Sequence, residues 1–190
     1  MTSDRTADPL EKGQPAGPVR PSSAFYVIVR GPLGVGKSTV SLQLAERLGA
    51  KYISIDRILE EADLWVEGAL PEFLRANDIT ISRARESLTR GTPVIVDGNF
   101  YWKTQIQDLI ERLDFRGYVF TLRASLEVCI ARDAERESPF GEAATTEVFA
   151  KTTRFEWGTE VDANGRLEAV IDEIVARLSG SQENAVRAPH

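Results

Sequence analysis

Cysteine and histidine are almost missing from this chain of 190 residues. It contains one cysteine, Cys129, and one histidine, His190, which is its last residue. A disulfide needs two cysteines and a Cys/His metal site needs several such ligands, so a single chain can assemble neither. Low cysteine content is typical of a reducing compartment, and we therefore expect a cytoplasmic protein.

Long apolar runs are also missing. No run approaches the ~20 apolar residues that a membrane-spanning helix needs. Residues 1–23 are rich in Pro, Gly, Ser and charge, without the basic and apolar regions of a signal peptide. We expect no membrane association, a flexible arm at 1–23, one folded domain at 24–179 and a flexible tail at 180–190.

Positive charge is in deficit, because 23 Lys and Arg residues face 29 Asp and Glu residues, for a formal net charge of −6. Nucleic-acid binding draws much of its affinity from counterions that basic side chains release. The charge balance therefore disfavours a nucleic-acid partner, and we expect a monomer or homodimer that acts on a small molecule.

Apolar, β-branched runs alternate along the chain with segments of helical periodicity. Strands are expected at 25–30, 51–55, 93–97, 117–122 and 158–162, and helices at 37–48, 57–65, 79–90, 102–113, 125–137, 145–156 and 166–178. Such alternation is typical of a parallel sheet with helices on both faces. We therefore expect an α/β fold of three layers, doubly wound around a five-stranded parallel sheet.

A glycine-rich segment joins the first expected strand to the first expected helix. Residues 31–38 read GPLGVGKS, a full match to the phosphate-binding pattern G-x-x-x-x-G-K-[ST]. Glycine lets the backbone curl so that its N–H groups converge on phosphate oxygens at a helix N-terminus. The predicted nucleotide ligands are Gly31, Gly34, Val35, Gly36, Lys37, Ser38 and Thr39.

The charged and hydroxyl residues of this loop predict ATP and Mg²⁺ as cofactors. Lys37 would reach the β- and γ-phosphates, the Ser38 hydroxyl would ligate Mg²⁺, and Thr39 would contact the α-phosphate. The alternative is a glycine-rich turn that only connects a strand to a helix. The guanine-reading pattern Asn-Lys-x-Asp does not occur in the sequence, which disfavours a GTPase.

Three further segments, YISIDRILEE (52–61), VIVDGNF (94–100) and CIARDAERE (129–137), carry a family resemblance. With the phosphate loop they make residues 25–178 similar to the small P-loop kinases of the shikimate, gluconate and adenylate kinase group. The resemblance implies the strand order 2-3-1-4-5, a short lid at 138–144 and transfer of the γ-phosphoryl group of ATP.

In the first segment, Asp56 resembles the aspartate with which this group orients or deprotonates the acceptor hydroxyl. Arg57 would hold an anionic part of the acceptor. Shikimate kinases have another aspartate two residues before this position, whereas this chain has Ser54. The alternative role for Asp56 is that of a helix N-cap.

In the second segment, Asp97 resembles the Walker B aspartate at the end of a buried strand. It would hold a magnesium-bound water or the Ser38 hydroxyl. The alternative is an ordinary turn aspartate before Gly98. Asn99 follows and would face the acceptor.

In the third segment, Arg132 and Arg136 lie four residues apart, on one face of the expected helix. The resemblance implies that Arg132 packs on the adenine and that Arg136 acts in catalysis by reaching the transferring phosphoryl group. The alternative is a solvated helix face that pairs these arginines with Asp133, Glu135 and Glu137.

The acceptor has no recognisable signature in the sequence. Asp56 favours a hydroxyl of a metabolite, sugar or antibiotic-like compound. A nucleoside monophosphate kinase would need a phosphate clamp, for which Arg57, Arg83 and Arg85 are candidates. A nucleotide-binding regulator without turnover is a third possibility, and a polynucleotide 5′-hydroxyl kinase ranks last.

Overall fold

The computed structural model describes residues 24–64 and 69–180 of the chain. The expected arm at 1–23 and the residues beyond 180 lie outside the described part. In these two ranges no helix is both long and apolar enough to cross a membrane. The elements are β1 (Phe25–Arg30), α1 (Lys37–Leu48), β2 (Lys51–Ser54), α2 (Ile55–Glu61), α3 (Leu70–Thr89), β3 (Val94–Gly98), α4 (Lys103–Leu113), β4 (Arg116–Arg123), α5 (Leu126–Ala134), α6 (Glu142–Thr153), β5 (Thr159–Asp162) and α7 (Leu167–Gly180).

The five strands form one parallel sheet in the order β2-β3-β1-β4-β5, which confirms the predicted fold. Ser54 at the end of β2 lies beside Asp97 of β3, and Arg30 at the end of β1 lies beside Gly98. The carboxyl ends of these three strands therefore meet at one edge of the sheet, where ligands bind in open α/β folds.

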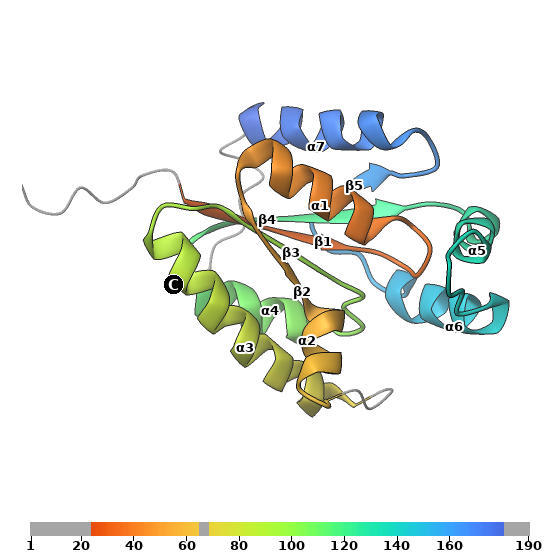
Figure 1. Cartoon of the computed structure of the whole chain (residues 1–190), viewed down its shortest axis with the longest axis horizontal. Coiled ribbons are helices and arrows are strands. Elements are labelled where there is room, and N and C mark those ends of the chain that lie inside the picture. The colour runs from red at the N-terminus through yellow and green to blue at the C-terminus, as the bar shows by residue number, and fades with distance from the viewer. Residues whose placement is uncertain (1–23, 65–68, 181–190) are drawn as a thin grey trace, which may run out of the picture.

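Helices cover both faces of the sheet (Figure 1). α1 and α7 lie on one face, α2, α3 and α4 lie on the other, and α5 and α6 lie together near the ends of β1 and β4. In β1, Val27 and Val29 join the core under α1 and α7, whereas Tyr26 and Ile28 join the core on the other face. Burial on both faces explains why this strand is a continuous apolar run in the sequence.

α3 is much longer than predicted. It begins at Leu70, whereas we expected its start at residue 79, and Pro71 in its first turn is a favourable helix start. The buried polar residues Asn77 and Thr80 interrupt the apolar spacing along α3, and this spacing is the signal from which a helix is predicted.

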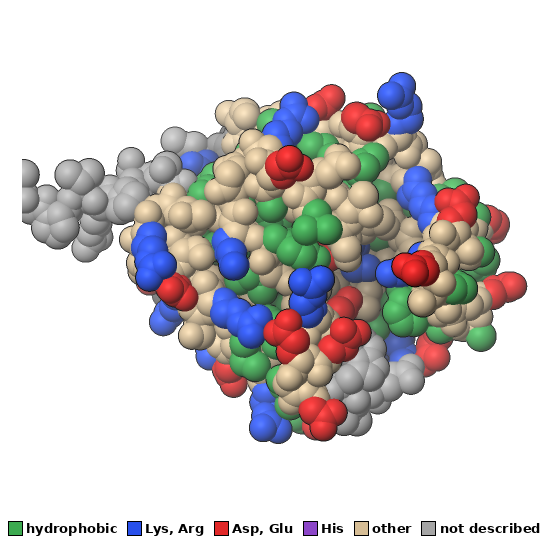
Figure 2. All heavy atoms as spheres, viewed as in Figure 1, with side chains coloured by type: hydrophobic (Ala, Val, Ile, Leu, Met, Phe, Trp, Pro, Cys, Tyr) green, Lys and Arg blue, Asp and Glu red, His purple; other side chains and the backbone are tan. Residues whose placement is uncertain are grey.

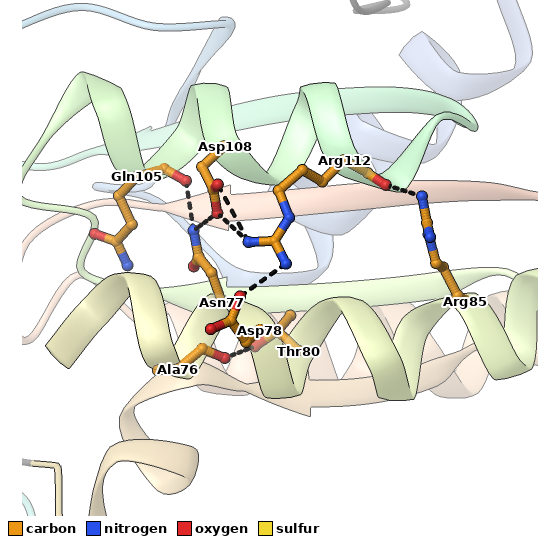
Figure 3. Close-up of polar contacts among 8 residues, drawn as sticks. All are labelled: Ala76, Asn77, Asp78, Thr80, Arg85, Gln105, Asp108 and Arg112. Atoms are coloured by element: carbon orange, nitrogen blue, oxygen red, sulfur yellow. Dashed lines mark hydrogen bonds and ion pairs between the residues drawn. The ribbon is translucent and has the colours of Figure 1, made fainter. Parts of the chain in front are cut away.

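Polar contacts explain why Asn77 can be buried in that helix. Its Nδ2 donates to the Gln105 carbonyl and to Asp108 Oδ2 on α4, each at 2.9 Å (Figure 3). Arg112 joins the same seam, with Nη2 lying 2.7 Å from an Asp78 carboxylate oxygen. Polar contacts thus join α3 and α4 beside the apolar contacts that these helices make in the core.

The boundaries of α5 and α6 also differ from the prediction. α5 ends at Ala134, three residues early, because the buried Asp133 carboxylate accepts a 2.8 Å hydrogen bond from the Gly141 N–H and draws the chain back. Arg136 therefore lies beyond the helix, and the expectation that it shares a helix face with Arg132 is wrong. α6 begins at Glu142 and α7 includes Gly180, which we expected to open the tail.

Candidate active site

Two glycines of the phosphate loop adopt backbone conformations that favour glycine. Gly34 has φ 77° and Gly36 has φ 99°. A Cβ atom on Gly34 would lie 2.1 Å from the carbonyl oxygen of Cys129, so the absence of a side chain also lets α5 pack against the loop. Gly36 is the N-cap of α1, and no side chain caps this helix, which leaves its first N–H groups to an anion.

Lys37 is buried inside the loop, where its Nζ donates to the Pro32 carbonyl at 2.9 Å. Burial lowers the pKa of Lys37, while the charges of Asp56 and Asp97 act in the opposite direction and Arg136 adds to the lowering. The predicted catalytic side chains therefore gather within electrostatic range of one ammonium group. Ser38 and Thr39 are exposed at the mouth of the loop.

Asp97 links the loop to the neighbouring strands. Its Oδ2 accepts a 2.8 Å hydrogen bond from Ser38 Oγ, and its Oδ1 accepts one of 3.1 Å from the hydroxyl of Tyr52. Within residues 24–64 and 69–180, no group of three His, Cys, Asp or Glu side chains could hold a metal. The oxygen atoms of Ser38 and Asp97 fit Mg²⁺, which binds proteins through one or two oxygen ligands together with phosphate oxygens and water.

Asp56 lies in the first turn of α2 but does not cap it. Ser54 is the N-cap and accepts a hydrogen bond from the Arg57 N–H at 3.4 Å, so the N-cap interpretation of Asp56 is wrong. Asp56 Oδ2 accepts from Asn99 Nδ2 at 3.4 Å, and its buried Oδ1 has no hydrogen-bond partner in the described part of the chain.

The Asp56 carboxyl group is more easily protonated in the folded protein than in water. Burial raises the pKa of Asp56 to about 6, with further raising by Asp97 and Glu60 and an opposing effect from Lys37. A carboxylic acid of this kind exchanges its proton near neutral pH, as a general base requires.

Arg57 lines a groove at the outer edge of β2. This groove, with a volume of about 550 Å³, is lined by β2 together with Arg57, Glu61, Arg83 and Arg90 among others. Arg83 is ion-paired with Glu61 at 3.3 Å. Arg85 lies elsewhere and donates to the Arg112 carbonyl (Figure 3). The three arginines considered for a phosphate clamp therefore do not converge.

Arg132 is bonded to four backbone carbonyls. Its guanidinium donates to Val35 at 3.3 Å in the phosphate loop, and to Ala163, Asn164 and Gly165 at 2.7, 3.3 and 3.3 Å in the loop after β5. It thus connects the phosphate loop with the segment after β5. We did not predict this bridging from the sequence.

Arg136 lies in the loop between α5 and α6, within the segment adjoining the expected lid. Its Nη1 is 3.6 Å from Asp133 Oδ1, so Asp133 is one of the acidic partners that we considered. The guanidinium also lies 5.0 Å from the centroid of the Phe140 ring, which is 61% exposed. Both side chains lie on the outside of the loop.

Two features near the site were not predicted. An aromatic cluster follows Asn99, in which the rings of Phe73, Tyr101 and Trp102 lie 5.2 to 5.7 Å apart. Their position directly after the end of β3 was a usable signal, because such positions face the ligand edge.

The second unpredicted feature is Arg30, the residue before the phosphate loop. It is fully buried and donates to the carbonyls of Thr152 at 2.6 Å and Phe155 at 3.4 Å, at the end of α6. Burial lowers the pKa of Arg30 to about 10. No ion pair involves it in the two described ranges, and an apolar strand gave no reason to expect a buried cation.

A family model described as an AAA domain matches residues 27–156. This segment includes the phosphate loop, Asp56, Asp97 and Arg136. The chain belongs to this family. Within that AAA domain, the parallel sheet brings the matched polar residues to one edge, as described above.

Solved P-loop kinases share the fold of this AAA domain. A gluconokinase from Sinorhizobium meliloti 1021 aligns with TM-score 0.67 and 18% identity over 84% of this chain and 93% of that one. A sugar kinase from Janibacter sp. HTCC2649 aligns with TM-score 0.72 and 17% identity over 86% of this chain and 99% of that one. The shikimate kinase from Acinetobacter baumannii aligns with TM-score 0.56 and 16% identity over 85% of this chain and 97% of that one.

Adenylate kinase isoenzyme 5 of Bos taurus, Mus musculus and Homo sapiens matches locally. The human adenylate kinase isoenzyme 5 is 39% identical over 56 residues, which are 30% of this chain and 10% of that protein. The chain thus aligns with about a tenth of the length of that relative. The match agrees with a P-loop kinase family but transfers no whole-protein activity.

Proposed function

We propose that this AAA domain is an ATP-dependent kinase that transfers the γ-phosphoryl group to a hydroxyl of a small molecule. The observation that carries the proposal is Asp56, whose Oδ1 has no hydrogen-bond partner among the described residues and whose pKa is raised to about 6. It lies within electrostatic range of Lys37, the residue that would hold the γ-phosphate. A base beside the transferable group is what acceptor activation needs.

Each side chain has a defined task in the proposed reaction. Lys37 binds the β- and γ-phosphates, while Ser38 and Asp97 orient Mg²⁺, which neutralises phosphate charge when bound. Asp56 accepts the proton of the acceptor hydroxyl. That oxygen forms the new bond to the γ-phosphorus as the bond to the β–γ bridging oxygen breaks, and ADP leaves with the electron pair.

Arg136 would act when the segment at 138–144, whose last three residues open α6, closes. Charge builds on the equatorial oxygens of the transferring group, and an arginine that arrives on closure stabilises it and excludes water. Release of Arg136 from Asp133 and Phe140 would be required. Water competes with the contact to Phe140, which is 61% exposed, whereas the Asp133 side chain is buried.

A neutral hydroxyl is favoured over a nucleoside monophosphate as acceptor. Of the candidate clamp residues, Arg57 and Arg83 line one groove, where Arg83 is paired with Glu61, whereas Arg85 contacts the Arg112 carbonyl, so the three do not form a single phosphate clamp. The named neighbours in structure are kinases of gluconate, sugar and shikimate, which supports a hydroxylated metabolite. Lys and Arg side chains are interspersed with Asp and Glu side chains on the face in Figure 2, which also disfavours a polynucleotide.

A coupled assay of ADP release tests the proposal. The protein is incubated with ATP and Mg²⁺ and, separately, with sugars, sugar acids, hydroxylated aromatic and alicyclic acids, aminoglycosides and nucleoside monophosphates. We expect ADP release above background with one hydroxylated compound and, by mass spectrometry, one added phosphoryl group on it. Transfer to a nucleoside monophosphate would contradict the acceptor class, and nucleotide binding without transfer to any compound would indicate a regulator.

A further inference from the structure

Tyr52 lies on β2, two residues before Ser54, and therefore on the same face of the sheet as Asp97. Its hydroxyl reaches across to β3 and donates to Asp97 Oδ1 at 3.1 Å, while Ser38 Oγ donates to Oδ2 at 2.8 Å. Both carboxylate oxygens thus have a donor, one on β2 and one on α1.

We propose that Tyr52 is a positioning residue for the Mg²⁺·ATP complex, because its hydroxyl fixes the orientation in which Asp97 receives the Ser38 hydroxyl. The inference rests on the proposed function only as far as binding of Mg²⁺·ATP. It assigns to this chain a hydrogen bond that the sequence pattern of the phosphate loop and the Walker B strand does not contain.

The physical argument concerns rotation of the carboxylate. A carboxylate held by a single donor can turn about its last side-chain bond, since this torsion has a broad energy minimum. A second donor on another strand removes that freedom. Ser38 can then keep its proton directed at Asp97 while its oxygen lone pairs face the metal, as a second-sphere carboxylate requires.

The tyrosine is suited to this role because it stays a donor. Burial raises the pKa of Tyr52 to about 12, and the charge of Asp97 adds to the raising. The phenol therefore remains protonated at every pH at which the protein would work. Its ring packs against the core under α1 and α7, so removal of the hydroxyl alone leaves the packing in place.

Tyr52→Phe tests the inference, with Tyr26→Phe as a matched control. Tyr26 lies on β1, and its buried hydroxyl has no hydrogen-bond partner among the described residues. By isothermal titration calorimetry, we expect Tyr52→Phe to weaken binding of Mg²⁺·ATP about tenfold and to leave binding of ATP in EDTA unchanged. The Mg²⁺ concentration for half-saturation at fixed ATP should rise by a similar factor, and the control should match the wild type in both experiments.

Two results would overturn the inference. One is a Tyr52→Phe protein with the Mg²⁺ dependence of the wild type. The other is an equal loss of ATP binding with and without the metal, which would indicate a structural role. If the wild-type protein binds Mg²⁺·ATP but phosphorylates no compound, the proposed kinase activity is rejected. The test of Tyr52 remains valid in that case, because it measures binding alone.

Discussion

The two halves of the site differ in how completely their polar groups are paired. In the nucleotide half, Arg132 bonds four carbonyls and Asp97 has a donor on each oxygen. In the acceptor half, the buried atoms Asp56 Oδ1 and Asn99 Oδ1 have no hydrogen-bond partner in the described ranges. Buried polar atoms are costly to leave unpaired.

This difference indicates that the nucleotide half is preorganised by the chain itself, whereas the acceptor half is completed by what binds there. A ligand that supplies hydrogen bonds to Asp56 and Asn99 would remove an existing cost, which favours an acceptor rich in hydroxyl groups. Substitutions in the two halves should therefore have separable effects on nucleotide binding and on transfer.

The largest effect is expected from Lys37→Ala, which removes the cation from the phosphate loop. Phosphoryl transfer should fall by about 10³-fold, because the developing charge loses a fixed donor in a buried site. Steady-state assay of acceptor phosphorylation measures it. Lys51→Ala is the control, since Lys51 is exposed at the start of β2 and should leave the rate unchanged. Equal rates in the two variants would remove Lys37 from the mechanism.

Asp56→Asn should separate the halves most clearly. We expect kcat to fall by about 10²-fold, because an amide cannot take the proton from the hydroxyl of the acceptor. The Kd for ATP should change by less than about twofold. Asp63→Asn, an exposed residue just after α2, is the matched control. Loss of ATP affinity in Asp56→Asn would show that the two halves are not separable.

Arg132→Ala should affect the nucleotide half. Without the bridge from Val35 to the loop after β5, we expect the Kd for ATP to rise about tenfold and kcat to change less. Titration calorimetry and initial rates measure the two quantities. The control is Arg166→Ala, because Arg166 follows the same loop with a side chain that is 88% exposed. A fall in kcat at unchanged Kd would contradict this assignment.

The smallest effect is on stability. The pKa of Asp56 is raised from 3.8 to about 6, so the folded state holds the proton more tightly than the unfolded chain. The free energy of unfolding therefore falls as pH rises between those values, and the cost of the buried charge is complete above pH 6 and absent below 3.8.

Asp56→Asn removes that charge and should raise the Tm at about pH 8 by a few degrees, with little change near about pH 3.5. Circular dichroism during heating measures both. A Tm gain of the same size at both pH values would mean that the effect comes from packing and not from ionisation.

Sequence reasoning located the phosphate loop between β1 and α1, because its pattern lies in consecutive residues. The strand order and the neighbouring positions of Ser38 and Asp97 agree with the structure. Contacts between distant segments were not accessible, such as the carbonyls held by Arg132. The length of α3 was also underestimated, since Asn77 is stabilised by groups on α4 that the local sequence does not contain.

Arg30 has one more consequence for nucleotide binding. The carbonyls that it contacts at Thr152 and Phe155 lie at the carboxyl end of α6, where the helix dipole is negative. The guanidinium also lies 4.2 Å from the centroid of the Phe155 ring, and the charges of Glu160 and Arg123 act on its pKa in opposite directions. The chain thus holds a buried cation directly before the phosphate loop through carbonyl partial charges and a ring face. On the proposed function, we expect a neutral residue at position 30 to weaken the electrostatic attraction for a triphosphate.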